Sequence, residues 1–144
     1  MGLRLIITPA EIEWARDAVQ RAREQFPRFC SHGATTYRWK DTPIFDCCFE
    51  EVVISKLWLE HFEHAKNVSR RHSSYGCKHF AENWAGRYVA NGALIAAAAG
   101  LGITQKPCDV GSPNTVLAIK YNSWPKGISW SSLNPAIDSV EVVC

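Results

Sequence analysis

One segment constrains the fold more than any other: residues 73–102 predict a central helical hairpin, two helices joined by a short turn. Ser73 or Ser74 can cap the first helix by accepting a hydrogen bond from a free backbone amide. Lys78 and Glu82 then stand four residues apart, a spacing that favours an ion pair along a helix. We therefore expect this first helix to begin at the two serines.

The rest of the hairpin is marked by its aromatic and alanine residues. Phe80, Trp84 and Tyr88 recur every four positions, which predicts a buried aromatic stripe. Asn91 can cap the second helix, expected over residues 93–99 and built almost entirely of alanine. Such a helix can pack very closely against a neighbour, either inside the protein or against a second copy in a homodimer.

Two further helices are expected before the hairpin. Residues 8–11 read Thr-Pro-Ala-Glu and predict a capping box with proline in the first helical turn, and Pro27 ends that helix. A second helix is expected to open near Thr42 or Asp46 and to extend to Phe62.

Strands are expected at both ends of the chain. Residues 3–7 form a short apolar run, and residues 115–121 have the β-branched composition of a strand that residues 128–130 or 140–143 could pair with. The predicted fold class is α+β: a helix-rich N-terminal two-thirds followed by a small C-terminal antiparallel sheet.

Length and composition predict a single domain, residues 1–144, in which 47% of the residues are hydrophobic and 21% charged. The longest apolar run is too short to span a bilayer, and the N-terminus lacks the pattern of a signal peptide, so we expect a cytoplasmic protein without a membrane partner. In that setting the six cysteines are expected to be thiols.

Charge divides the chain into two regions. Residues 30–65 carry a net charge of −3, whereas residues 66–87 carry +4. The basic run from Lys66 to Lys78 leads into a helix N-terminus, where free amides and arginines together favour an anion such as phosphate. A tyrosine in this run could stack on a base, and exposed tryptophans often anchor interfaces. The predicted binding residues are Arg70, Arg71, Tyr75, Lys78, Trp124 and Trp130.

A Cys/His enzyme is one alternative to a binding protein. Cys77 stands in the first turn of a predicted helix beside cationic residues, an environment that lowers the pKa of a thiol. His79, His32 or His72 could act as its base. Signatures of common enzyme classes, such as a Walker loop, G-x-G-x-x-G, H-E-x-x-H or G-x-S-x-G, do not occur in the sequence. We therefore expect no cofactor.

A zinc site is the other alternative. Cys30, His32, Cys77 and His79 form two Cys-x-His pairs, and four such ligands suit tetrahedral zinc. The chain has no C-x-x-C pair, the spacing typical of structural zinc sites. The sequence leaves this alternative open.

Part of the hairpin resembles a known pattern. Residues 74–79 read S-Y-G-x-K-H, residues 88–92 read Y-V-x-N-G, and Ile-Ala-Ala follows at residue 95. This pattern resembles one found in small proteins of bacteria and their phages. The resemblance implies a mobile-element context, in which short chains often bind a host component, as anti-CRISPR inhibitors of bacterial defence do. The leading interpretation is thus a non-enzymatic protein that binds a nucleic acid or a host protein complex through a basic surface.

Overall fold

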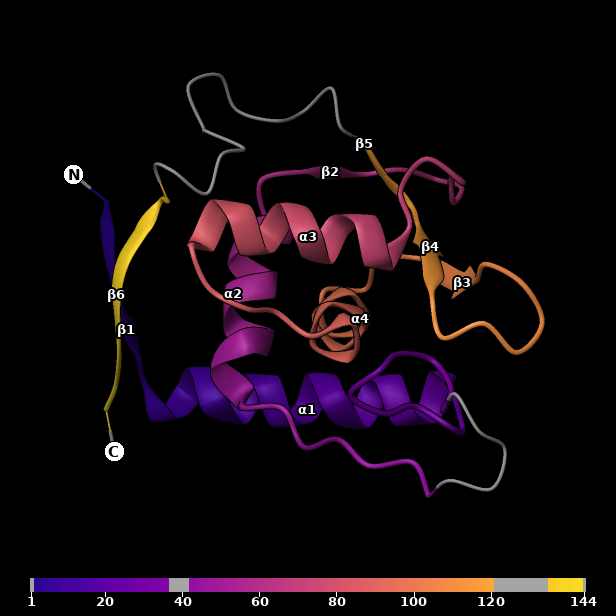
Figure 1. Ribbon diagram of the computed structural model, residues 1–144, viewed down its shortest axis with the longest axis horizontal. Helices are drawn as coiled ribbons and strands as arrows, with labels where there is room; N and C mark the ends of the chain where they lie inside the picture. Colours follow the sequence, from indigo (N-terminus) through magenta and orange to yellow (C-terminus); the bar gives the residue numbers. More distant parts are fainter. Residues whose placement is uncertain (1, 37–41, 121–134, 144) are drawn as a thin grey trace.

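The alanine-rich helix α4 (Asn91–Gly100) lies at the centre of the fold. The computed structural model describes residues 2–36, 42–120 and 135–143. Figure 1 shows α4 along its axis, with α1 (Pro9–Gln25) below it, α3 (Ser74–Ala85) above it and α2 (Phe49–Leu59) beside it. All three helices contact α4, and residues 91–99 are buried. The predicted homodimer through this helix is therefore wrong, because the chain's own helices cover it.

Helix α1 follows the sequence prediction closely. The Thr8 hydroxyl accepts a hydrogen bond from the Glu11 amide, and the Glu11 carboxylate accepts one from the Thr8 amide, so the capping box is confirmed. The helix ends at Gln25, just before Phe26 and Pro27. Small buried side chains face the core from this helix, and they allow α1 to pack against α4. They are Ala15, Ala18, Val19 and Ala22.

Helix α2 begins later than expected, at Phe49 rather than near Thr42 or Asp46. The reason is that Asp46 bonds Ser31 instead. The Asp46 amide donates to the Ser31 hydroxyl at 2.8 Å, and the Asp46 carboxylate accepts from the same hydroxyl. Asp46 therefore ties two loops together and is not available to cap a helix. The helix ends at Leu59.

The predicted start of the hairpin at the two serines is confirmed, whereas the predicted buried stripe of Phe80, Trp84 and Tyr88 is wrong. The Ser73 hydroxyl accepts from the Gly76 amide at 3.1 Å, and Ser73 is the N-cap of α3. Gly86, with φ of +69°, turns the chain out of α3. Tyr88 consequently leaves the helix and is 67% exposed, Phe80 is 37% exposed, and only Trp84 is buried. In Figure 1 α3 and α4 cross each other, so they do not form an antiparallel pair.

Asn91 does not cap α4, because its side chain has other partners. Its Nδ2 donates to the carbonyl oxygen of His32 at 2.8 Å, to that of Pro113 at 3.3 Å and to Oδ1 of Asn114 at 3.0 Å. Ala90 takes the N-cap position instead. One buried amide thus joins two loops to the first turn of the central helix.

The strands form three pairs within the described residues, in place of the single C-terminal sheet that was expected. β1 (Leu3–Ile7) runs parallel to β6 (Ile137–Val142), so the predicted pairing of residues 140–143 with residues 115–121 is wrong. β2 (Glu63–His64) is antiparallel to β5 (Ile119–Lys120). β3 (Gln105–Pro107) is antiparallel to β4 (Thr115–Leu117).

The coarse fold class, mixed α+β, is confirmed by these helices and strand pairs. The alternative pairing segment, residues 128–130, lies outside the described residues. Within the described ranges, no helix combines the length and the apolar character that crossing a membrane requires.

Candidate functional site

The basic connection between β2 and α3 is fixed along β4. The Ser69 amide donates to the Leu117 carbonyl at 3.4 Å, and the Leu117 amide donates to the His72 carbonyl at 2.8 Å. Ser73 and Val116 form an isolated antiparallel bridge. Residues 69–73 therefore run beside β4 as an irregular extra strand, and this pairing positions the arginines that they carry.

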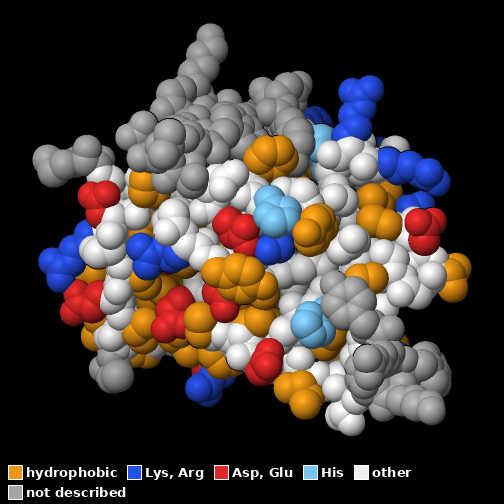
Figure 2. Space-filling view, in the orientation of Figure 1, with side chains coloured by type: hydrophobic (Ala, Val, Ile, Leu, Met, Phe, Trp, Pro, Cys, Tyr) orange, Lys and Arg blue, Asp and Glu red, His pale blue; other side chains and the backbone are white. Residues whose placement is uncertain are grey.

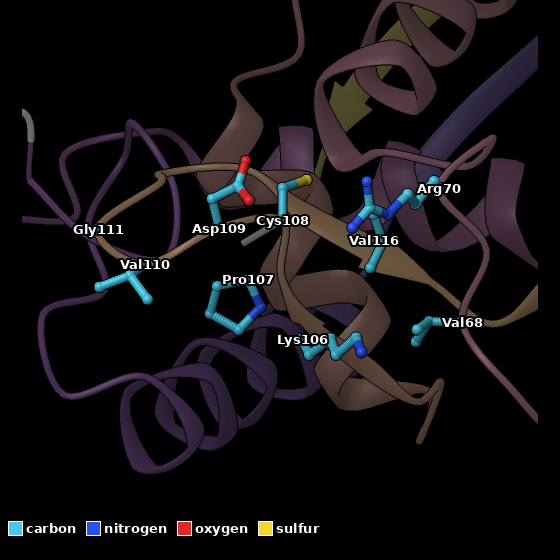
Figure 3. A pocket seen from close by; sticks show the side chains of 9 residues that line it. All are labelled: Val68, Arg70, Lys106, Pro107, Cys108, Asp109, Val110, Gly111 and Val116. Carbon is cyan, nitrogen blue, oxygen red and sulfur yellow. The ribbon is translucent and has the colours of Figure 1, made fainter.

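An open groove of about 780 Å³ lies between this connection and the β3–β4 hairpin (Figure 3). Much of its lining is apolar. The charged groups are Arg70 from the connection, Lys106 from β3, and Asp109 from the hairpin loop. The apolar lining residues are Val68, Pro107, Val110 and Val116.

The loop that closes the hairpin is held by its own backbone. The Cys108 amide donates to the Asn114 carbonyl at 2.9 Å, and the Ser112 amide donates to the Asp109 carbonyl at 3.1 Å. Gly111 has φ of +76°, a value that favours glycine. Because Asn114 also accepts from the buried Asn91 amide, this wall of the groove is anchored to the central helix.

The electrostatics of the groove favour an anion. Arg70 and Lys106 are both exposed, and in the described ranges neither forms an ion pair. Partial burial and the Asp109 carboxylate raise the pKa of the Cys108 thiol, while the Arg70 guanidinium opposes that rise. In Figure 3 the Cys108 sulfur points toward the side of the groove that carries Arg70. Two cations and one carboxylate therefore face a largely apolar floor.

The structure separates the predicted binding residues. Arg70 lines the groove, whereas Arg71 is exposed outside the lining, with its amide donating to the Ser69 hydroxyl at 3.3 Å. Lys78 is only 6% exposed, and its ammonium bonds Glu82 at 2.6 Å, so its prediction as a phosphate contact is wrong. Trp124 and Trp130 lie outside the described residues.

Tyr75 belongs to a second surface, on α3 and the turn after it. Its ring meets the His79 ring edge-on, with centroids 4.6 Å apart. The Lys78 Nζ lies 5.8 Å from the centroid of Tyr75 and 4.6 Å from that of Tyr88. Figure 2 shows a histidine side chain over α3 with hydrophobic, acidic and basic side chains against it. We call Tyr75, His79 and Tyr88 the three-ring surface.

The geometry does not support a catalytic Cys77. Its side chain is completely buried in the core, and a nucleophilic thiolate must reach its substrate. His79 stands two residues further along α3 and points to a different side of the helix, where Glu82 Oε2 is 3.1 Å from its Nδ1. The other two candidate bases were His32 and His72. His32 lies exposed in the loop after α1. His72 lies in the connection before α3, where burial lowers its pKa.

The geometry does not support the predicted zinc site either. In the part of the chain that the structure describes, no three His, Cys, Asp or Glu side chains are close enough together to hold a metal ion. Cys30 and Cys77 are buried, whereas His32 and His79 are exposed. The five described cysteines, Cys30, Cys47, Cys48, Cys77 and Cys108, are free thiols.

Sequence reasoning missed Lys106 and the hairpin that carries it. The prolines and glycine of residues 107–113 indicate a loop, but they do not show which segment the loop faces. That placement depends on the pairing of β3 with β4 and on the Asn91 anchor. Comparison with family models, curated proteins and solved structures finds no match.

Proposed function

We propose that this protein binds nucleic acid through the groove between residues 68–70 and the β3–β4 hairpin. One observation carries the proposal: Arg70 and Lys106 project from separate elements into one apolar-floored groove, exposed and without an ion pair in the described residues. A guanidinium binds phosphate oxygens bidentately, and an ammonium adds a second positive charge. Apolar side chains between two cations suit the sugars and bases that join successive phosphates.

The neighbouring charges support the same ligand. Lys66 and Arg71 are exposed on the same connection as Arg70. Asp109 is the acidic residue in the groove lining. A chain of phosphates could follow the connection, with Asp109 limiting the affinity.

The salt dependence of binding to a labelled oligonucleotide tests the proposal. Each phosphate contact contributes about −0.7 to the slope of log K against log salt for a single strand and about −0.9 for a duplex. The Arg70→Ala, Lys106→Ala double variant should weaken binding and reduce the slope by about two contacts. Asp109→Asn should act in the opposite direction and tighten binding.

A matched control removes two positive charges elsewhere. Arg4 on β1 and Arg16 on α1 are exposed and lie away from the groove lining. The Arg4→Ala, Arg16→Ala variant changes the net charge equally and should leave the slope nearly unchanged. Equal losses in both double variants, or no binding by the parent protein at low salt, would overturn the proposal.

The wider biological role that we propose rests on the resemblance of residues 74–92 to small bacterial and phage proteins. In that context nucleic-acid binding would serve a mobile element, and inhibition of a host defence system is one such role. Expression in a bacterium with active CRISPR immunity tests this role. It predicts restored plating of a targeted phage, and that restoration should require Arg70 and Lys106.

A further inference from the structure

The three-ring surface exposes aromatic area that the fold does not bury. Tyr75 is 51% exposed and Tyr88 67% exposed, and the His79 side chain is 47% exposed. Large aromatic side chains usually contribute to a core, whereas these three rings lie exposed near Lys78 and are available for a ligand. The Tyr75 and Tyr88 rings lie on the same surface because both contact the Lys78 ammonium.

The ion pair of buried Lys78 with partly buried Glu82 lies beneath the rings and holds them in place. Glu82 binds Lys78 Nζ at 2.6 Å through Oε1, and its Oε2 lies 3.1 Å from Nδ1 of His79. The same Oε1 accepts from the Val89 amide at 3.3 Å, which fixes the turn that carries Tyr88. Rings fixed before binding lose little conformational entropy when a ligand stacks on them. Lys78 therefore acts as a positioning residue for this surface.

The three-ring surface adjoins the groove through β4. Val116 lines the groove and bridges Ser73, the N-cap of α3, while the Thr115 amide donates to the Ser74 hydroxyl at 2.9 Å. Tyr75 follows Arg70 by five residues, which span at most about 17 Å of extended chain. A strand of a few nucleotides is therefore long enough to reach from the groove to the rings.

From this arrangement we propose that the ligand is a single-stranded nucleic acid, with phosphates at Arg70 and Lys106 and unstacked bases on Tyr75 and Tyr88. This inference rests on the proposed function and narrows it. In a duplex the base faces are stacked on each other, whereas a single strand presents them to aromatic side chains. Every base has such a face, so the surface binds without strong sequence preference.

An abasic oligomer separates the rings from the charges. The probes are a labelled twelve-residue oligothymidylate, its uridylate counterpart, an abasic phosphodiester of equal length and a duplex. Removing one ring should weaken oligothymidylate binding by about 5- to 140-fold, because stacking contributes roughly that factor per base. The Tyr75→Leu, Tyr88→Leu variant should lose this affinity while its affinity for the abasic oligomer and its salt slope stay unchanged.

Ring-preserving variants provide the control. Tyr75→Phe and Tyr88→Phe retain the aromatic faces and should bind oligothymidylate like the parent protein. Circular dichroism of each variant verifies its fold, which substitutions at exposed positions should leave intact. Tighter binding of uridylate or of thymidylate supports the inference in either case and identifies the natural strand as RNA or DNA.

The outcomes separate this inference from the proposed function. Equal affinity for the duplex and the single strand, or an equal loss for thymidylate and the abasic oligomer in the leucine variant, would overturn the single-strand inference alone. Absence of binding to every polyanion would overturn both proposals.

Discussion

Replacing Lys78 with methionine should strongly destabilise the protein, although the substitution keeps the length of the side chain. The side chains of Lys78 and Glu82 are 8% and 19% exposed. Loss of one partner from a buried ion pair costs about 3–5 kcal/mol. Glu82 retains two donors, the Val89 amide and His79, and has some contact with water. We therefore expect a loss of about 2–3 kcal/mol in the free energy of unfolding.

Urea denaturation measures this loss directly, and thermal melting should show a fall in Tm of roughly 5–10 °C for a chain of this size. Lys56 and Glu60 provide a matched control, because they form the same ion pair at the same spacing with side chains 24% and 45% exposed. Lys56→Met should cost less than about 1 kcal/mol.

A second variant tests the mechanism of the loss. Adding Glu82→Gln to Lys78→Met removes the carboxylate that has lost its partner and should recover about 1 kcal/mol. Equal costs at Lys78 and Lys56, or a double variant no more stable than Lys78→Met, would refute the reasoning that burial makes this pair important.

Three further predictions concern a glycine, a histidine and a thiol. Gly92→Ala should cost at least about 1–3 kcal/mol in urea denaturation, because the new Cβ would overlap the Cys30 carbonyl oxygen. Gly76→Ala should change the stability by less than about 1 kcal/mol, because the higher helix propensity of alanine is opposed by a 3.3 Å contact of its Cβ with the Ser73 hydroxyl that caps α3. Burial lowers the pKa of His72 in the folded state, so the unfolded chain binds a proton at a higher pH than the folded chain does. The contribution of neutral His72 to stability is therefore fully present above the ordinary histidine pKa and is lost as the pH falls below that value. His72→Gln should make thermal stability less sensitive to acidification, and equal sensitivity would contradict this cause. Partial burial, together with nearby carboxylates, raises the pKa of Cys48 to about 12, so mass spectrometry should show slower alkylation at mildly alkaline pH than for a free cysteine.

Local signals in the sequence predicted local structure well. The Thr8–Glu11 capping box, the Ser73 cap and the Lys78–Glu82 pair each depend on residues within four positions of one another, and all three are confirmed. Such interactions are set by helix geometry alone.

Predictions failed where a distant segment competes for a residue. Asn91 has the chemistry of a cap, but its amide bonds the loops at His32 and at 113–114 instead. Tyr88 fits a helical stripe until Gly86 turns the chain away. The parallel pairing of β1 with β6 joins opposite ends of the chain, which no short pattern could reveal.

The candidate site could be predicted only in part for the same reason. The basic character of residues 66–78 is visible in the sequence, and Arg70 is found where an anion can reach it. Lys78 looks equally suitable in the sequence, but Glu82 and two rings enclose its ammonium. Lys106 was missed because it reaches the groove only through the folding of the β3–β4 hairpin.

The most direct test of nucleic-acid binding at this groove is a two-dimensional NMR titration of the labelled protein with oligothymidylate. We expect amide shifts to concentrate in residues 68–73, 75–79 and 105–116 and around Tyr88, with little change in α1 or in the β1–β6 pair. Shifts concentrated on α1 and β1–β6, or no shifts at low salt, would contradict it.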